Sequence, residues 1–142
     1  MPVPDAVADV IVRESGGVPY YVQAIALQTW LVARRRGAKR TAEADVAAAL
    51  DELVEVHREV YEAIAASLGE TVRRLLSSLA KEPIARFDAD YRARHFLPGA
   101  TTIASALAKL VESGHVEKGA SGCRVADPFH ARYLRETPAR VL

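Results

Sequence analysis

Residues 101–126 read TTIASALAKLVESGHVEKGASGCRVA, and this stretch decides the fold. Its first half predicts a helix over residues 101–113, because apolar side chains recur there at helical spacing. These apolar residues are Ile103, Leu107, Leu110 and Val111. Gly114 follows, and a glycine can adopt the left-handed conformation that ends a helix.

A hairpin and two more helices complete the pattern. Residues 115–118 and 123–126 are short strand-like runs separated by Gly-Ala-Ser-Gly, which is typical of a β-hairpin turn. Helical patterns at 70–80 and 87–96 precede them. Three helices followed by a two-stranded wing is the order of a winged helix-turn-helix domain. We therefore expect a mainly α fold with a winged helix-turn-helix domain at residues 67–142.

Local signals add detail to this domain. A last helix is expected at residues 129–136, with Asp127 as its N-cap and Pro128 as its first residue. Pro138 is expected to end it. In the helix at 87–96, three aromatic side chains are candidates for the core: Phe87, Tyr91 and Phe96.

The first 66 residues predict a small bundle of three helices. Residues 5–15 form the first, ended by the glycine pair after Ser15, and residues 19–36 form the second. Apolar residues such as Leu27 leave little of the second helix polar, so we expect it to be central. The basic run at 34–40 is interpreted as a solvated helix end.

A long third helix is expected from Thr41, as N-cap, to residue 66. Its predicted apolar stripe includes His57 and Val60, and its acidic residues, Asp45 among them, are expected on the other faces. This surface is more acidic than a DNA-facing helix tolerates. A turn at residues 67–69 is the predicted domain boundary.

Bulk properties exclude several classes of protein. The net charge is +1; residues 1–67 hold 7 Lys and Arg against 10 Asp and Glu, and residues 68–142 hold 12 against 8. This mild asymmetry is well below that of an obligate nucleic-acid binder. One cysteine, Cys123, excludes an internal disulfide, and no apolar run is long enough to span a membrane. We expect a cytoplasmic protein without a membrane partner.

The motifs of common enzymes are absent. The sequence has no phosphate-binding loop of the form G-x-x-x-x-G-K-[ST], no H-E-x-x-H and no nucleophile elbow. The acidic residues are spaced like a solvated helix face. We therefore expect no catalytic residues, no metal site and no cofactor in this chain itself.

Two separated stretches resemble a known family. Residues 15–23 read SGGVPYYVQ and residues 124–135 read RVADPFHARYLR. In this order they are similar to the C-terminal part of archaeal-type P-loop ATPases of the STAND/AAA+ superfamily, which are related to origin-recognition initiators. His130 departs from the bulky apolar residue usual in the second motif.

The resemblance implies a concrete organisation. Residues 1–66 would be the helical lid subdomain, and Gly17, Val18 and Pro19 would contact the adenine and ribose of ATP or ADP, with Mg, held by an upstream P-loop domain. That domain is absent from this sequence, so the chain is expected to be a C-terminal piece that does not hydrolyse ATP alone.

A winged helix could also bind DNA through its third helix and wing. The candidate contacts to DNA or to a protein partner are Arg92, Arg94, Thr101, Thr102, Ser105, Lys109, Lys118 and Arg124. The predicted helix at 101–113 lacks Arg, Asn and Gln for bidentate base readout, and its Glu112 opposes phosphate. Docking to protein is therefore favoured. The competing hypotheses are a free-standing transcriptional regulator that binds DNA and a protein-interaction adaptor.

Overall fold

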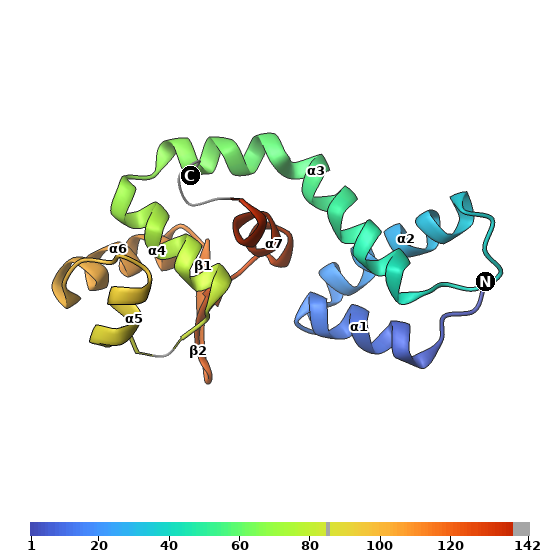
Figure 1. The fold of residues 1–142 in the computed structure, drawn as a ribbon, viewed down its shortest axis with the longest axis horizontal. Coiled ribbons are helices and arrows are strands. Elements are labelled where there is room, and N and C mark those ends of the chain that lie inside the picture. The colour runs from blue at the N-terminus through green and yellow to red at the C-terminus, as the bar shows by residue number, and fades with distance from the viewer. Residues whose placement is uncertain (85, 138–142) are drawn as a thin grey trace. The chain divides into compact units, whose positions relative to one another are not determined.

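The computed structural model describes residues 1–84 and 86–137, and it confirms a mainly helical fold with a two-stranded sheet (Figure 1). The chain divides into two compact units, Met1–His57 and Arg58–Leu142. Its elements are α1 (Asp5–Ser15), α2 (Pro19–Arg35), α3 (Glu43–Ser67), α4 (Glu70–Lys81), α5 (Ala89–Arg94), α6 (Ala100–Glu112), β1 (Val116–Gly119), β2 (Gly122–Val125) and α7 (Pro128–Glu136). The division between the units falls within α3.

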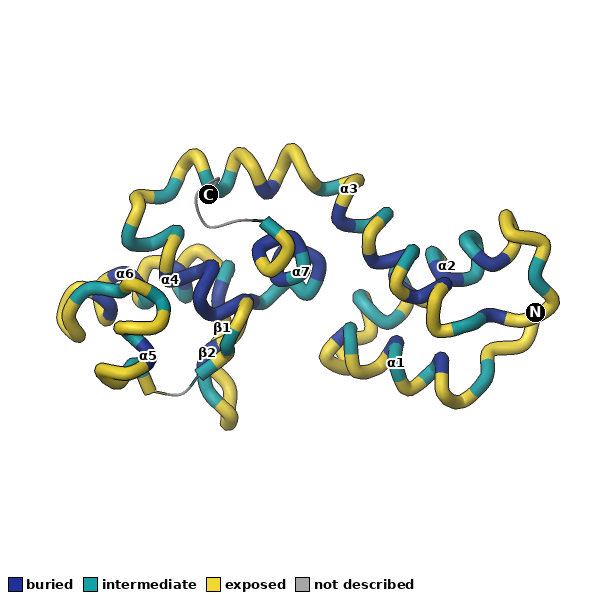
Figure 2. The backbone as a smooth tube through the Cα atoms, viewed as in Figure 1, coloured by how far each residue is buried: buried dark blue, intermediate teal, exposed yellow. Residues whose placement is uncertain are grey.

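The first unit consists of α1, α2 and the first part of α3. Buried residues recur among exposed and intermediate ones along each helix (Figure 2). The apolar core includes Val7, Ile11, Ile25, Ala33, Val46 and Leu50. The expectation that α2 is a central helix of the bundle is wrong on the side that carries Leu27, because this residue is 60% exposed. One face of α2 therefore carries apolar side chains that this unit does not bury.

The start of α3 also differs from the prediction. Thr41 is not the N-cap, because its hydroxyl lies 3.4 Å from the Pro2 carbonyl oxygen and the helix begins two residues later. Asp45 caps the start of the helix instead, since its Oδ2 accepts a hydrogen bond from the Ala42 amide at 2.8 Å. Asp45 is buried, contrary to its predicted exposed position, and is paired with Arg36.

The Arg36–Asp45 pair explains how a carboxylate is tolerated there. The guanidinium donates from Nε and Nη2 to the two carboxylate oxygens, at 2.9 and 2.6 Å. These hydrogen bonds lower the pKa of the Asp45 carboxyl. Part of the basic run at 34–40 thus pairs within its own unit, where Arg35 also contacts Glu52.

The second unit is built around α4, which packs against α6, α7 and β2. Leu75, Leu76 and Leu79 are buried at helical spacing, as the sequence predicted. In α6, Ile103 and Leu110 are buried. Gly114 follows with φ +82°, which confirms the left-handed stop.

The wing is an antiparallel hairpin. β1 and β2 pair from Val116 with Val125 to Gly119 with Gly122, so each strand is shifted by one residue from its predicted bounds. A bridge to Ile84 extends the sheet, because the amide of Cys123 donates to the Ile84 carbonyl at 2.9 Å. The Cys123 thiol is buried in this sheet.

The second helix of the winged unit is shorter than predicted. Asp88 caps it by accepting the Tyr91 amide at 2.9 Å, so Phe87 lies before the helix. Tyr91 is fully buried, as expected for a core aromatic. Phe96 is not in the core: its side chain is 78% exposed and its φ is +54°.

The last part of α3 belongs to the winged unit. Tyr61 is buried against α7, whereas Val60, predicted on the same apolar stripe, is 56% exposed. Asp127 confirms its predicted role as the N-cap of α7, accepting the Phe129 amide at 2.9 Å. The predicted stop at Pro138 lies outside the described residues.

Within residues 1–84 and 86–137, none of the helices combines the length and apolar character needed to cross a bilayer.

Candidate functional site

The turn between α1 and α2 contains the three residues predicted to contact nucleotide. It begins with a Schellman motif, in which the Gly16 amide donates to Arg13 at 3.2 Å and the Gly17 amide to Val12 at 3.1 Å. Gly16 and Gly17 have φ values of +65° and +75°, which glycine adopts at little cost. The sequence pair Gly16-Gly17 is therefore needed to reverse the chain here.

The following residues open α2. Val18 is extended and Pro19 takes the first helical position, with no side chain capping the helix N-terminus. Gly17, Val18, Pro19 and Tyr20 are all exposed. A Cβ on Gly17 would meet no atom within 4 Å, so the space beside it is open. The turn can therefore be approached closely from outside.

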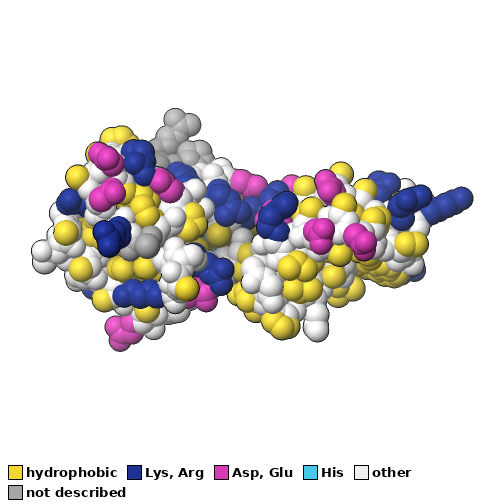
Figure 3. Space-filling view, turned by 90° about the horizontal axis from the view of Figure 1, so that it is seen from below, with side chains coloured by type: hydrophobic (Ala, Val, Ile, Leu, Met, Phe, Trp, Pro, Cys, Tyr) yellow, Lys and Arg dark blue, Asp and Glu magenta, His cyan; other side chains and the backbone are white. Residues whose placement is uncertain are grey.

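The unit that contains this turn also exposes large apolar side chains. Figure 3 shows apolar atoms gathered over the unit that contains residues 1–57. The exposed large apolar residues of this unit include Val12, Val18, Tyr20 and Leu27. Such an area is typical of a surface that another domain or protein covers.

On the winged unit, α6 presents the predicted recognition face. Its exposed residues include all four predicted contacts on this helix together with Glu112. The four are Thr101, Thr102, Ser105 and Lys109. Most side chains on this face are short, and it carries one cation and one anion. It can therefore form hydrogen bonds through its hydroxyl groups but attracts phosphate only weakly.

Two of the three predicted arginine contacts are already paired. Arg94 Nη2 lies 2.5 Å from Glu82 Oε1, and Arg124 Nε donates to Glu117 Oε1 at 2.6 Å. The side chains of His95 and Arg94 both bond to Glu82 and lower the pKa of its carboxyl. Both arginines therefore have a carboxylate partner that a DNA phosphate would have to displace.

The other cations are placed differently. Arg92 donates to the Asp88 carbonyl at 3.3 Å. Lys109 and Lys118 are exposed and pair with no carboxylate in the part of the chain that the structure describes. Figure 3 shows basic and acidic side chains intermingled on the visible face of the winged unit, so no single-sign field develops there.

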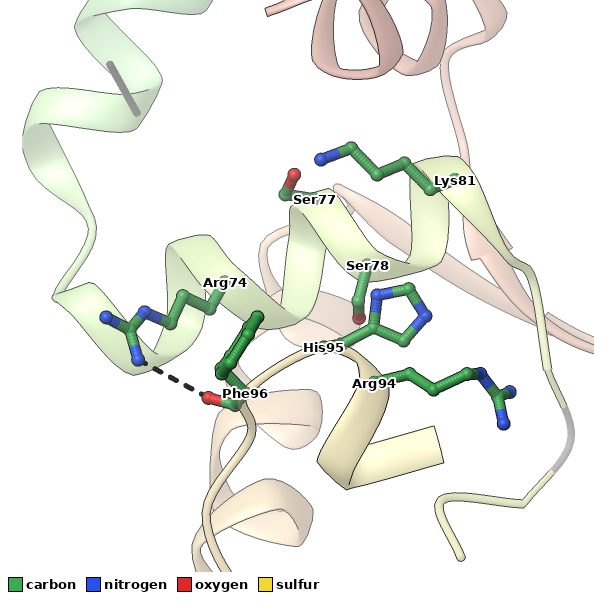
Figure 4. A pocket seen from close by; sticks show the side chains of 7 residues that line it. All are labelled: Arg74, Ser77, Ser78, Lys81, Arg94, His95 and Phe96. Atoms are coloured by element: carbon green, nitrogen blue, oxygen red, sulfur yellow. Dashed lines mark hydrogen bonds between the residues drawn. The ribbon is translucent and has the colours of Figure 1, made fainter. Parts of the chain in front are cut away.

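A pocket that the sequence did not indicate lies in the same unit (Figure 4). It has a volume of about 350 Å³ and is lined by Arg74, Ser77, Ser78, Lys81, Arg94, His95 and Phe96. One wall is a face of α4 and the other is the end of α5 with the turn that follows. Of these seven residues, only Arg94 was predicted from the sequence as a contact. The lining residues are spread over two separate segments without a shared motif, so no sequence pattern indicated a pocket.

Elsewhere the residues that could bind metal do not converge. No group of three or more His, Cys, Asp or Glu side chains suitable for a metal ion occurs among residues 1–84 and 86–137. The buried histidine His130 is stacked on Tyr61 and has its pKa lowered to about 4 by burial. It is a neutral packing residue in this fold.

The helix order and hairpin define a winged helix protein, and comparison with known families agrees. The family model described as "Probable winged helix domain" matches residues 59–136. The match covers more than half of the chain, which therefore belongs to this family. Searches of curated proteins and of solved structures found no match to the chain.

Proposed function

We propose that this chain is a non-catalytic regulatory module in which the winged helix docks onto a protein surface. The pairing of Arg94 with Glu82 and of Arg124 with Glu117 carries this proposal. A winged helix that binds DNA needs free cations beside its third helix and on its wing. Here both arginines are paired with carboxylates, which disfavours phosphate binding. This pairing favours docking onto a protein surface through hydrogen bonds from the hydroxyl groups of α6.

The finer part of the proposal concerns nucleotide. We infer from the resemblance to STAND/AAA+ ATPases that residues 1–66 are a lid subdomain that acts with a P-loop domain holding ATP or ADP with Mg. The open Gly17 and the uncapped start of α2 support a nucleotide contact, because a glycine allows close approach and a helix N-terminus favours negative charge. The exposed apolar area around Tyr20 would be covered by that P-loop domain.

The competing function is a DNA-binding transcriptional regulator. Lys109 and Lys118 favour it, since both are exposed without a carboxylate partner among the described residues. Two such cations on the third helix and the wing would give weak binding with a shallow salt dependence.

Fluorescence anisotropy separates the two functions. The chain is titrated into a labelled random duplex and into duplexes selected for binding, at low and at physiological salt. We expect weak binding that lacks sequence preference and disappears at physiological salt. Tight binding to one sequence that Lys109→Ala abolishes would show that the winged helix is a DNA reader.

The nucleotide role is tested in the longer protein that carries the P-loop domain. Pro19→Ala is expected to weaken adenine nucleotide binding, because it removes a rigid apolar contact at the turn. Pro4→Ala is the matched control, since Pro4 also lies at a helix N-terminus. Equal affinity in both variants, or the lack of a phosphate-binding loop encoded ahead of these residues, would remove the nucleotide role.

A further inference from the structure

The pocket between α4 and α5 brings basic side chains together from two elements. Arg74 and Lys81 come from α4, whereas Arg94 and His95 come from the end of α5. Figure 4 shows Ser77 and Lys81 along one edge and Arg94, His95 and Phe96 along the other, with Ser78 facing His95. Its volume of about 350 Å³ is in the range of small-molecule sites.

The charge in this pocket is only partly balanced. Arg74 pairs with the exposed Glu70 at 2.7 Å, and Arg94 shares Glu82 with His95. Lys81 is exposed and makes no ion pair among the described residues. An anion entering here would meet one unpaired cation, Lys81, whereas Arg74 and Arg94 each keep a carboxylate partner.

A buried hydroxyl in the pocket also lacks a partner. Ser77 is 5% exposed, and its Oγ makes no hydrogen bond within the described part of the chain. A buried polar group without a partner is costly, so natural proteins usually satisfy it. The Lys81 side chain runs back along α4 towards this hydroxyl (Figure 4), so both could donate to one anionic group.

Phe96 at the pocket adopts a conformation that favours glycine. It occupies the left-handed position of a Schellman motif, with its amide donating to Ala93 at 3.4 Å and the Leu97 amide to Arg92 at 2.8 Å. Its φ is +54°, and the residue is 78% exposed. Neither backbone preference nor core packing explains a phenylalanine here, and such strain often marks a functional site.

We propose that this pocket binds a nucleoside phosphate, with the phosphate held by Lys81 and the Ser77 hydroxyl and the base stacked on Phe96. A lysine ammonium and a hydroxyl can both donate to phosphate oxygens, and an exposed aromatic ring can stack on any of the nucleic-acid bases. This site lies in the winged unit and does not depend on the function proposed above.

The ligand can come from two sources with this same chemistry. One is a free nucleotide, and the other is the phosphorylated 5′ end of a single strand. A base-paired duplex does not fit, because its bases are stacked inside and cannot offer a ring to Phe96.

Calorimetric titration of the whole chain tests the proposal with AMP, adenosine, inorganic phosphate and a short 5′-phosphorylated oligonucleotide. We expect AMP to bind about tenfold more tightly than phosphate, because stacking adds to the ionic contacts, and adenosine to bind most weakly. Tighter binding of the oligonucleotide than of AMP would identify the strand end as the source. Equal or weaker binding would identify the free nucleotide.

Variants assign the contacts. Lys81→Ala is expected to weaken AMP and phosphate binding about tenfold. Ser77→Ala should weaken both as well, whereas Phe96→Gly should weaken AMP binding alone. Lys39→Ala is the matched control, because it removes an exposed cation outside the pocket that makes no ion pair among the described residues. Circular dichroism establishes that each variant is folded.

Any one of three results would overturn the proposal. They are the lack of saturable AMP binding up to about 10 mM, equal affinity for AMP and adenosine, and AMP affinity that Phe96→Gly and Lys81→Ala leave unchanged in folded protein.

Discussion

The phenol ring of Tyr61 lies flat on the imidazole of His130, with ring centroids 4.6 Å apart and planes within 5° of parallel. Its hydroxyl also donates to Asp127 Oδ2 at 3.2 Å. One side chain from the last part of α3 thus contacts both the cap and the first turn of α7. This explains why the family match begins at residue 59, before the first helix of the winged pattern.

Truncating Tyr61 tests this relationship. Tyr61→Ala is expected to lower the free energy of unfolding by about 3 kcal/mol, because it leaves a cavity and removes the stacking partner of His130. Tyr61→Phe should cost about 1 kcal/mol, the value of the hydrogen bond to Asp127. Urea denaturation of both variants measures these values, with Val60→Ala as the exposed neighbouring control. Equal effects at positions 60 and 61 would contradict the contact.

His130 predicts a pH dependence of stability. Burial lowers its pKa from 6.5 to about 4, despite the opposing charge of Asp127, and nearby His115 lowers it further. The unfolded chain therefore takes up a proton first as the pH falls, and the folded state loses about 2 kcal/mol between pH 7 and 5. Denaturation midpoints across this range measure the loss.

His130→Phe keeps a flat ring against Tyr61 and removes the proton, so its stability should change little over the same range. The lowered pKa of Glu82 affects stability only below the ordinary carboxyl range, so it does not interfere above pH 5. A variant with the same slope as the parent would show that His130 is not responsible.

Asp45 is expected to stabilise the first unit. Asp45→Ala removes the cap on α3 and leaves Arg36 without its partner, which should cost about 2 kcal/mol. Since the pKa of Asp45 is lowered in the folded state, its contribution is present above the ordinary pKa of 3.8 and is lost as the pH falls below it. Denaturation followed by the fluorescence of Trp30 measures the effect.

Glu43→Ala is the control for this change, because Glu43 is exposed in the same first turn of α3. It should alter stability by less than about 0.5 kcal/mol. Similar losses in the two variants would mean that helix-end charge, and not the buried pair, stabilises this end.

Phe96 should be a position where stability can be gained. Phe96→Gly is expected to raise the free energy of unfolding by about 1 kcal/mol, because glycine adopts a positive φ without the Cβ clash. Phe96→Ala keeps the Cβ and should give no such gain. Thermal denaturation compares the two, and a destabilised glycine variant would show that the exposed ring contributes to packing.

Freeing the paired arginines should create affinity for DNA. Glu82→Gln with Glu117→Gln leaves Arg94 and Arg124 without carboxylates, so non-specific duplex binding at low salt should rise and its salt slope should steepen by about 2. Anisotropy titration at several salt concentrations measures this. The control Glu43→Gln changes charge outside the winged unit and should have a smaller effect.

Local sequence rules predicted much of this fold. Gly114 and Asp127 were assigned correctly, because a left-handed stop and an N-cap depend on a few neighbouring residues. Thr41 was a wrong N-cap, because Asp45 accepts the Ala42 amide at the helix start and is itself held by Arg36, which follows α2. Propensity alone does not include such tertiary competition.

The candidate sites were less predictable than the elements. The sequence named Arg94 and Arg124 as free contacts, but their carboxylate partners lie 12 and 7 residues away and are apparent only in three dimensions. Phe96 was expected in the core because aromatic residues usually are, and no sequence pattern signals its left-handed backbone. The helices and the hairpin could therefore be predicted from local residue spacing, whereas the pocket depends on contacts between elements that are distant in sequence.

Each unit of this protein contains one natural reporter. The single tryptophan, Trp30, lies in the first unit beneath the guanidinium of Arg34, and the single cysteine, Cys123, is buried in the sheet of the second. Indole emission and thiol labelling can therefore follow the two halves separately in one unmodified sample. Comparing the time courses of the two signals would show whether the two units unfold together or one after the other.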